Sequence, residues 1–292
     1  MQLNRFQLRT DFWQVLIYGF LAVMALIMIY PFWELFIVSI SPAEEASKTG
    51  LKIIPQGFTL EAYKEVFQSE QIWYGFMNTI FRTVVGTTIS VFLYFCTAYP
   101  LSKKNLVGRN WITVFFLIPM FFGGGLIPNF LLVRSLGLFD TIWALIIPSL
   151  FSTFHILVMR NFLMSIPASL EESAFIDGAG PFTVLTKIII PLSKPVLATV
   201  GLWVAVNHWN SWLDAMIYTS SNENVVLQTI VRRVLIEEDS AGITDSLTGD
   251  EGIVSKTMEA ATVLLCIGPI ILAYPFLQKY FVKGVLTGSL KG

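Results

Sequence analysis

Long runs of apolar residues separated by shorter polar segments dominate this chain. A helix needs roughly 20 mostly apolar residues to cross a hydrocarbon core of about 30 Å. The runs that meet this requirement lie at about residues 13–38, 74–100, 111–133, 141–163, 196–218 and 258–280. We expect each to be a helix, because an open strand leaves backbone groups unpaired in lipid. The pattern therefore predicts an all-α membrane protein with six transmembrane helices, in which residues 1–292 form one transmembrane domain.

Composition supports a membrane protein and excludes other classes. Of the 292 residues, 54% are hydrophobic and only 13% are charged, which is more apolar than a soluble domain of this size. The net charge of −1, with no basic patch interleaved with aromatic residues, argues against nucleic acid as a partner. The first apolar run is too long for the core of a signal peptide and lacks a small-residue cleavage site, so we interpret it as a retained span.

Residues 165–195 differ from both the apolar runs and the polar loops. Ser169 followed by Glu172 has the spacing of a capping box, which predicts that a helix starts there. Gly178 can close that helix in the left-handed conformation, and Pro181 suits the first turn of a second helix. The segment is therefore expected to form two short helices joined by a glycine turn.

The second short helix is expected to be apolar on one face. Pro191 and Pro195 are expected to break it before the next span begins. The apolar positions with helical spacing are Phe182, Leu185, Ile188 and Ile189. An apolar face outside the membrane needs a partner.

This segment resembles the EAA loop of ABC-importer permeases. The family pattern is Glu-Ala-Ala, three residues, Gly, nine residues, then Ile-x-Leu-Pro. The chain has Glu172-Ser173-Ala174, Gly178 and Ile188-Ile189-Ile190-Pro191 at these positions. Ser173 stands in place of an alanine, and Ile190 in place of the leucine.

Two further stretches resemble the carbohydrate-type, maltose-permease-like branch of that family. The tail at residues 278–292 is similar to its common ending, Lys-Gly-x-x-x-Gly-x-x-Lys-Gly, and residues 76–80, FMNTI, are similar to the start of its second span. The resemblance implies a permease subunit that moves an oligosaccharide or other carbohydrate into the cytoplasm. It places the loop on the cytoplasmic side, between spans four and five. It places the protein in the bacterial cytoplasmic (inner) membrane.

The resemblance also implies partners: a second homologous permease, two ABC ATPase subunits and an extracytoplasmic solute-binding protein, besides membrane lipid. The chain has no G-x-x-x-x-G-K-[ST] motif, so ATP and Mg²⁺ are expected at the ATPases, and this chain is expected to bind no cofactor and to be no enzyme. Its two histidines, His155 and His208, form no metal-ligand motif. In the family the loop seats in a cleft on the ATPase. The residues that correspond here are Glu171, Glu172, Ala174, Asp177, Gly178, Phe182, Leu185, Ile189 and Pro191.

The distribution of basic residues predicts the orientation. Placing both termini, the loop at 101–110 and residues 165–195 on one side collects eleven of the nineteen Lys and Arg residues there. Basic residues accumulate on the cytoplasmic side, so both termini are expected to be cytoplasmic. The segments 41–73 and 219–257 are then outer loops. The second is either a solvated insertion or a docking surface for the binding protein.

Polar side chains within spans are candidates for the translocation pathway, because burying them in lipid is costly. The fifth run combines aromatic rings with amide and carboxylate groups, which is the chemistry that recognises sugars. The candidate pathway residues are Arg82, Asn207, Trp209, Asn210, Trp212 and Asp214. Tryptophans also gather at membrane interfaces without any ligand, and that alternative stays open.

Other interpretations remain beside the sugar importer. One alternative is an ABC-importer permease that carries a non-sugar solute. A stand-alone secondary carrier predicts coupling carboxylates near the bilayer midplane, whereas Glu34 and Asp214 lie toward the outer ends of their spans. The identity of the sugar also stays open. Outer arginines such as Arg134, Arg232 and Arg233 suit an acidic saccharide, but they equally suit acidic side chains of the same face.

Overall fold

A computed structural model describes residues 12–235 and 256–289. In these ranges every regular element is a helix, which confirms the predicted all-α class. The described chain forms two compact units. The first comprises Met1–Gln68 and Val234–Leu265, and the second comprises Ser69–Arg233 and Cys266–Gly292. Residues 236–255 of the predicted outer loop at 219–257, the first residues with Arg5 and Arg9, and the last residues of the tail, 290–292, lie outside the described residues.

The first unit contains one long helix, two short ones and the first part of another long helix. Its helices are α1 (Phe12–Ser39), α2 (Ala43–Ala46), α3 (Glu61–Gln68) and the first part of α13 (Lys256–Ser289). The side chains of α1 are apolar on all faces and exposed along most of its length, as expected for a helix that meets lipid. The hydroxyls of Ser39 and Tyr63 lie 2.9 Å apart and join the end of α1 to α3.

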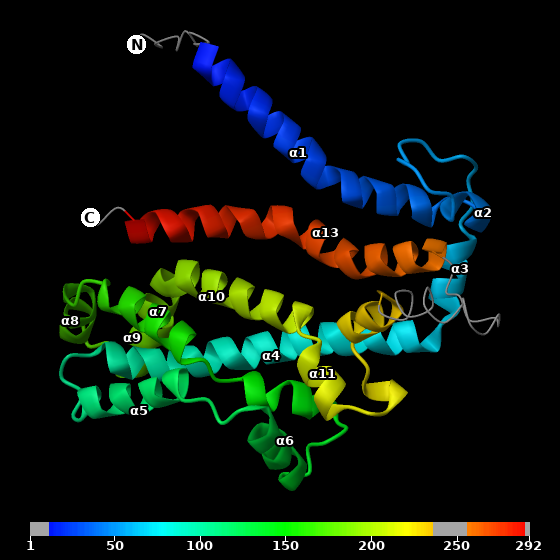
Figure 1. The fold of residues 1–292 in the computed structure, drawn as a ribbon. Coiled ribbons are helices and arrows are strands. Elements are labelled where there is room, and N and C mark those ends of the chain that lie inside the picture. Colours follow the sequence, from blue (N-terminus) through cyan, green and yellow to red (C-terminus); the bar gives the residue numbers. More distant parts are fainter. Residues whose placement is uncertain (1–11, 236–255, 290–292) are drawn as a thin grey trace. The chain divides into compact units, whose positions relative to one another are not determined.

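Three helices make the core of the second unit, α4 (Glu70–Ser102), α7 (Thr153–Met164) and α10 (Ile190–Asn210). They lie side by side (Figure 1) and share one cluster of buried apolar side chains. The cluster contains Tyr94, Phe95, Ala98 and Leu101 of α4, Ile156, Met159 and Leu163 of α7, and Val196, Val200 and Val204 of α10. This cluster fixes α4 against α10.

Two of the expected spans are bent. Helices α5 (Arg109–Phe121) and α6 (Leu126–Ser135) meet at 111°. The break between them contains Gly123, Gly124 and Gly125, and Gly125 has a φ of +81°, so the run at 111–133 is not one straight helix. The short helices η1 (Ile142–Leu145) and η2 (Ile147–Ser149) meet α7 at 49°.

The number of spans stays a prediction. Within the described residues, three helices are long and apolar enough to cross a membrane, and the number rises to five if each bent pair counts as one span. These three cover residues 13–39, 70–102 and 181–210. The helix α13 covers the run at 258–280 where the sixth span is expected.

The expected break at Pro191 and Pro195 is wrong. The helix α9 (Pro181–Val184), the π-helical turn η3 (Leu185–Ile189) and α10 follow one another without interruption. Proline lacks an N–H and its ring crowds the carbonyl four residues earlier. The wider π turn, in which the Ile190 N–H pairs with the Leu185 carbonyl, precedes the prolines and accommodates them. We call the continuous helix at 181–210 the α9–α10 rod.

The far end of this rod also differs from the expected boundary at 218. The rod ends at Asn210, and a second helix, α11 (Leu213–Tyr218), follows after Ser211 and Trp212. Residues 227–235 are again helical. The break turns the polar residues near 214 toward α4.

Candidate functional site

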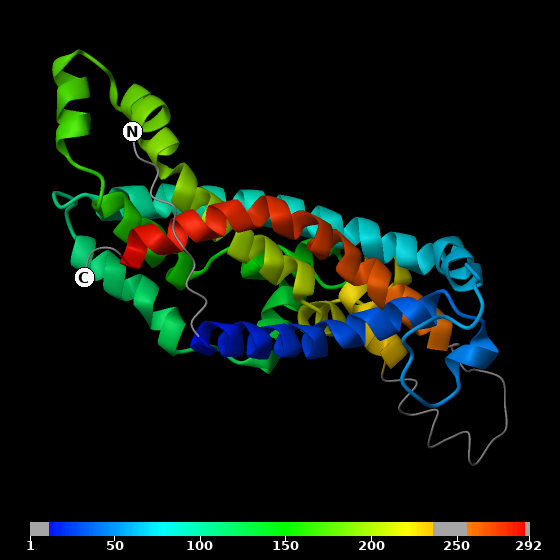
Figure 2. The same ribbon diagram turned by 90° about the horizontal axis from the view of Figure 1, so that it is seen from above.

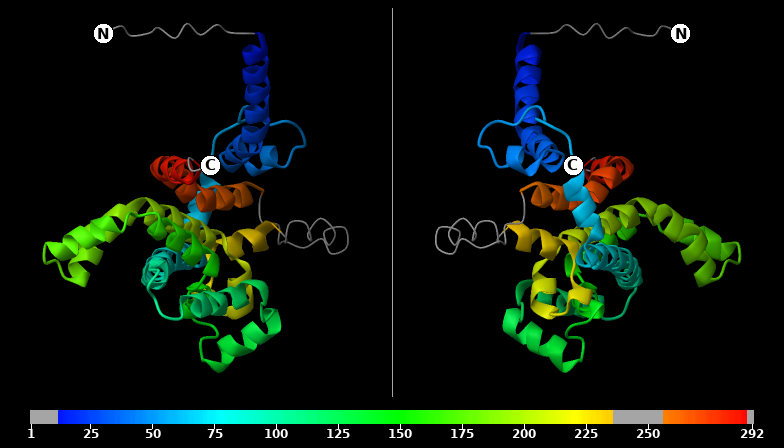
Figure 3. Two further views of the ribbon diagram at one scale, coloured as in Figure 1. Left: turned by 90° about the vertical axis from the view of Figure 1, so that its left-hand side faces the viewer. Right: turned by 90° about the vertical axis from the view of Figure 1, so that its right-hand side faces the viewer.

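The EAA-like segment is a helical hairpin made of α8 (Ser169–Ile176) and α9. We call residues 169–184 the coupling hairpin. Figures 2 and 3 show it, in green, standing away from the other helices of the second unit. Gly178 has a φ of +81°. Its N–H bonds to the Phe175 carbonyl at 3.1 Å, and the Ala179 N–H bonds to the Ala174 carbonyl at 2.9 Å. These two hydrogen bonds end α8 in a Schellman motif, so the predicted glycine turn is confirmed.

The capping box predicted at the start of α8 is wrong. The N-cap residue is Ala168, whose carbonyl accepts the Glu172 N–H at 3.1 Å, and no side chain caps the helix. Ser169 is therefore already inside the first turn. From there its hydroxyl is not placed to accept the first free amides.

One face of the coupling hairpin packs on the core. Within the hairpin, Val184 is buried, and Ala174 and Ala179 pack partly buried against the same cluster as α4 and α7. Just beyond the hairpin, in η3, Ile189 is buried and Leu185 packs against that cluster. Ile189, which the resemblance assigns to the ATPase contact, thus lies in the core of this chain. This packing fixes the base of the hairpin.

The other face is apolar and open. Ile176 is 86% exposed and Phe182 is 76% exposed, and Leu170 and Phe175 are also exposed. Glu172 and Asp177 of the same hairpin are also exposed. An exposed cluster of large apolar side chains rimmed by charge is typical of a protein-binding surface.

An ion pair joins the base of the hairpin to α4. Lys103, the first residue after α4, contacts both carboxylate oxygens of Glu171 through its Nζ atom. The same Nζ lies 4.6 Å from the centroid of the Tyr99 ring. The sequence analysis missed Lys103, because 68 residues separate it from Glu171 and no local pattern links the two.

A second ion pair joins α4 to α11, in the half of α4 away from Lys103. Arg82, only 1% exposed, pairs through Nη2 with Asp214 and donates from Nη1 to the Ser211 carbonyl at 3.1 Å. Asp214 Oδ1 also accepts the Ser211 hydroxyl at 2.8 Å and the Ala215 N–H at 2.9 Å. Two of the candidate pathway residues are thus brought together.

The other candidate pathway residues differ from one another in exposure. Trp209 is buried and donates from Nε1 to the Cys266 carbonyl at 3.3 Å. The Arg232 guanidinium lies 3.5 Å from the centroid of the Trp212 ring. Asn207 and Asn210 are exposed. The pathway assignment therefore stays a prediction, with the two asparagines as its most accessible members.

Two contacts that the sequence did not indicate secure the loops around α11. The Asn78 Nδ2 donates to the carbonyls of Glu223 and Val225 at 2.6 and 2.9 Å. Asp140, with a φ of +57°, accepts the N–H groups of Ser220 and Ser221 at 2.9 and 3.0 Å. These bonds hold the pKa of the Asp140 carboxyl well below its usual range.

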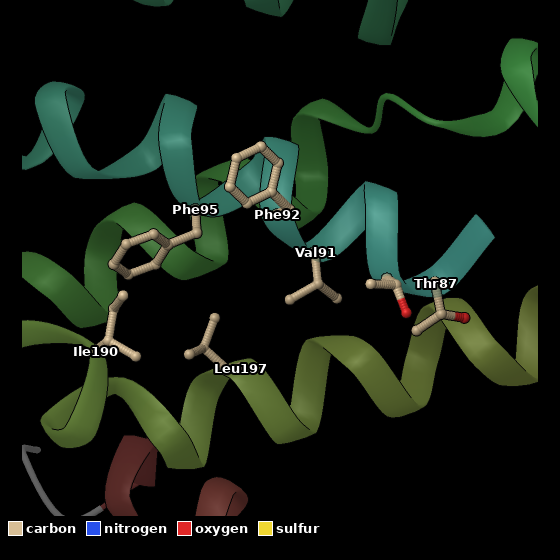
Figure 4. Close-up of a pocket in the computed structure, with 7 residues that line it drawn as sticks. Thr87, Val91, Phe92, Phe95, Ile190 and Leu197 are labelled. Atoms are coloured by element: carbon tan, nitrogen blue, oxygen red, sulfur yellow. The ribbon is translucent and has the colours of Figure 1, made fainter. Parts of the chain in front are cut away.

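A groove lies between two of the core helices. Between α4 and α10 lies an apolar groove of about 420 Å³ (Figure 4). Its walls are Thr87, Thr88, Val91, Phe92, Phe95, Ile190 and Leu197. Such walls offer few hydrogen-bond partners to a sugar. In the described part of the chain, no group of three His, Cys, Asp or Glu residues is placed to hold a metal ion.

Comparison with known proteins places this geometry in a family. Residues 86–287 match the family described as "Binding-protein-dependent transport system inner membrane component". The polygalacturonan/rhamnogalacturonan transport system permease protein YtcP of Bacillus subtilis is 37% identical over 286 residues, which cover 98% of this chain and 100% of the relative. Protein LplC of the same organism is 39% identical over 273 residues, covering 94% of this chain and 92% of the relative.

A solved structure is similar over nearly the whole chain. It is a bacterial ABC transporter involved in the import of the acidic polysaccharide alginate. One of its chains is 33% identical, with a TM-score of 0.84, and the match covers 95% of this chain and 100% of that chain. By sequence and by fold, this chain belongs to the family of inner membrane components of binding-protein-dependent transport systems.

Proposed function

We propose that this chain is a permease subunit of an ABC importer that moves an oligosaccharide into the cytoplasm. The observation that carries the proposal is the coupling hairpin, which combines the EAA-like spacing with an exposed apolar face and a glycine turn of φ +81°. A partner ATPase would bind this face and hydrolyse ATP. A second permease and an extracytoplasmic binding protein would complete the importer.

The proposed orientation puts the coupling hairpin and both termini in the cytoplasm of a bacterium, with the chain crossing the inner membrane several times. Lys103, Lys104 and Arg109 lie near the hairpin end of α4 and α5 in this arrangement, as the excess of basic residues on the cytoplasmic side requires. The loops around Asp140 and Asn224 then face outward, toward the binding protein.

The cargo proposed is an acidic oligosaccharide. Relatives named for polygalacturonan/rhamnogalacturonan transport and for alginate import support this class, because polymers of uronic acids carry a carboxylate on each such sugar. Arg134, Arg232 and Arg233 are exposed at the proposed outer side. Guanidinium groups bind carboxylates through two parallel hydrogen bonds.

The continuous α9–α10 rod suggests how the ATPase would drive the permease. Movement of the hairpin with the ATPase would move the rod, because the helix is continuous from residue 181 to residue 210. The rod ends at Asn210, which is one of the two exposed asparagines. The turn that follows it contacts the Arg82–Asp214 pair. The proposal is that ATP binding tilts this rod and opens the path between the two permeases.

Co-purification with the ATPase and the second permease of the same genome tests this proposal. No atom lies within 4 Å of the Cβ position of Gly178, so Gly178→Arg places its side chain on the docking face rather than in the core. Gly137→Arg is the matched control, since Gly137 also has a positive φ, of +70°, and open space around it, at the proposed outer side. We expect Gly178→Arg to lose the ATPase and Gly137→Arg to retain it. Equal retention by both variants would refute docking at the hairpin.

A further inference from the structure

We propose that Lys103 and Glu171 form a latch that makes α4 move together with the coupling hairpin. Glu171 then acts on α4 within this chain rather than on the ATPase. The inference rests on the proposed function, because it assumes that the hairpin is the part that the ATPase moves.

The need for a latch follows from how the two long helices connect to the hairpin. The α9–α10 rod continues directly from it, so it follows any movement of the hairpin through the backbone. The 33-residue helix α4 has no such connection, because α5, α6 and α7 lie between α4 and the hairpin in the sequence. Only side-chain contacts can transmit the movement to α4.

The Lys103 side chain is well placed for this role. Its backbone N–H bonds to the Pro100 carbonyl at 3.0 Å, which ties the residue to the last turn of α4. Its Nζ lies over the Tyr99 ring, and that ring stacks on Phe95 with centroids 6.1 Å apart. Phe95 belongs to the buried core cluster. The ammonium group is thus positioned by α4 before it meets Glu171.

Glu171 differs from the other carboxylates of the hairpin. Its side chain is 16% exposed and is turned toward α4, whereas Glu172 and Asp177 are exposed to solvent. Both oxygens of Glu171 contact the Lys103 Nζ. A carboxylate so engaged is not free for a second cation on a docking partner, while Glu172 and Asp177 are.

The latch has a counterpart farther along α4, in the half of the helix away from Lys103. There Arg82 binds Asp214 and the Ser211 carbonyl, just beyond the end of the α9–α10 rod. Held at these two places, α4 and the rod would tilt as one body. With the Lys103–Glu171 pair broken, only the apolar packing of the core cluster would couple α4 to the rod at the hairpin end, and less of the movement would reach α4.

Because the pair is partly exposed to water, it is better suited to transmit movement than to stabilise the fold. The Lys103 side chain is 38% exposed, and ion pairs with that access to water contribute little to stability. Its removal is therefore expected to change transmission of movement while leaving the bundle folded.

Charge reversal in the assembled importer tests the latch. The variants are Lys103→Glu, Glu171→Lys and the double variant that exchanges the two charges. Lys104→Glu is the matched control, because Lys104 is exposed, is the next residue, and makes no ion pair within the described residues. Lys103→Arg keeps the charge and serves as the conservative variant. Glu171→Gln removes the charge without placing two like charges together, so it remains informative if a reversal does not fold.

The measurements are ATPase retention, basal ATP hydrolysis, hydrolysis stimulated by the loaded binding protein, and uptake into proteoliposomes. We expect Lys103→Glu, Glu171→Lys and Glu171→Gln to retain the ATPase and basal hydrolysis, but to lose stimulated hydrolysis and uptake by about three- to tenfold. The exchanged pair and Lys103→Arg should recover most of the loss, and Lys104→Glu should behave as the unaltered chain.

Each other outcome would overturn the latch. If the single variants keep full stimulation, or if exchanging the charges restores nothing, the pair does not transmit movement. If Glu171→Gln loses the ATPase itself, Glu171 belongs to the docking face, and docking at the hairpin stands without the latch. If the unaltered chain retains no ATPase, the proposed function fails first and the latch with it.

Discussion

Arg82 of α4 and Asp214 of α11, separated by 132 residues in the sequence, form an ion pair whose arginine is almost completely buried. The guanidinium also binds the Ser211 carbonyl, at the break that ends the α9–α10 rod. The pair therefore joins α4 to the turn between α10 and α11. A structural role follows directly from this arrangement, whatever these residues do for the cargo.

Removing Arg82 should destabilise the protein. Arg82→Ala leaves Asp214 without its partner, and breaking a buried pair costs about 3–5 kcal/mol. We expect a lower unfolding temperature in detergent for Arg82→Ala than for Arg134→Ala, which removes an exposed arginine from the last turn of α6. Loss of uptake at unchanged stability would instead identify Arg82 as a pathway residue only.

Gly86 lets α4 approach His208. A Cβ atom on Gly86 would lie 2.5 Å from His208 Nε2 and 2.7 Å from Cε1, and the imidazole is 4% exposed. The ring has little room to move, so Gly86→Ala should cost about 1–3 kcal/mol, as overpacking does. Thermal unfolding would measure this cost.

A glycine of the same unit provides the control for this prediction. At Gly201 the added Cβ would meet only Val91 Cγ2, at 3.6 Å, which is an ordinary contact. Gly201→Ala should therefore leave stability unchanged or slightly raised. Equal losses for the two substitutions would mean that α4 and α10 are not in close contact at His208.

Asp140 should make the loop around α11 sensitive to acid. Its hydrogen bonds from Ser220 and Ser221 hold the pKa below the ordinary value of 3.8. As the pH falls, the Asp140 carboxylate is therefore protonated in the unfolded chain before it is protonated in the folded chain. The stabilisation by these hydrogen bonds is complete above the ordinary pKa and is lost as the pH falls below that pKa.

Measuring the free energy of unfolding of the unaltered chain and of Asp140→Asn at several pH values checks the direction of this pH dependence. Asparagine tolerates the positive φ, so the comparison isolates the charge. We expect a stability difference that is constant above about pH 5 and that narrows below pH 3.8. A difference that grows in acid would contradict the assignment.

Local chemistry explains what the sequence predicted well. The glycine turn at Gly178 depends only on neighbouring residues and on the freedom of glycine at positive φ, and it occurs where the spacing places it. The long apolar runs likewise predicted where helices lie. The long helices α1 and α4 cover the first two runs completely.

The failures have equally local causes. Pro191 was expected to end a helix, but a π turn just before it keeps the helix continuous, and a change from α to π pairing has no clear sequence signal. Ser169 was expected to cap α8, but the helix starts one residue earlier. Single boundary residues decide both cases.

The contacts that connect distant segments were beyond pattern reasoning. Lys103 and Glu171 both appear in polar stretches, and the sequence alone gives no reason to pair them. The same holds for Asn78 with Glu223 and Val225, which are separated by 145 and 147 residues. Such pairs depend on how the helices pack, and packing is visible only in three dimensions.

Site-specific photocrosslinking from Phe182 in the assembled importer tests the central claim most directly. The Phe182 side chain is 76% exposed at the tip of the coupling hairpin, and Leu136, 62% exposed beside the end of α6, is a control at the proposed outer side. The account predicts a crosslink from position 182 to the ATPase subunit and none from position 136. A crosslink to the ATPase from position 136, or the absence of one from position 182 in a complex that hydrolyses ATP, would contradict it.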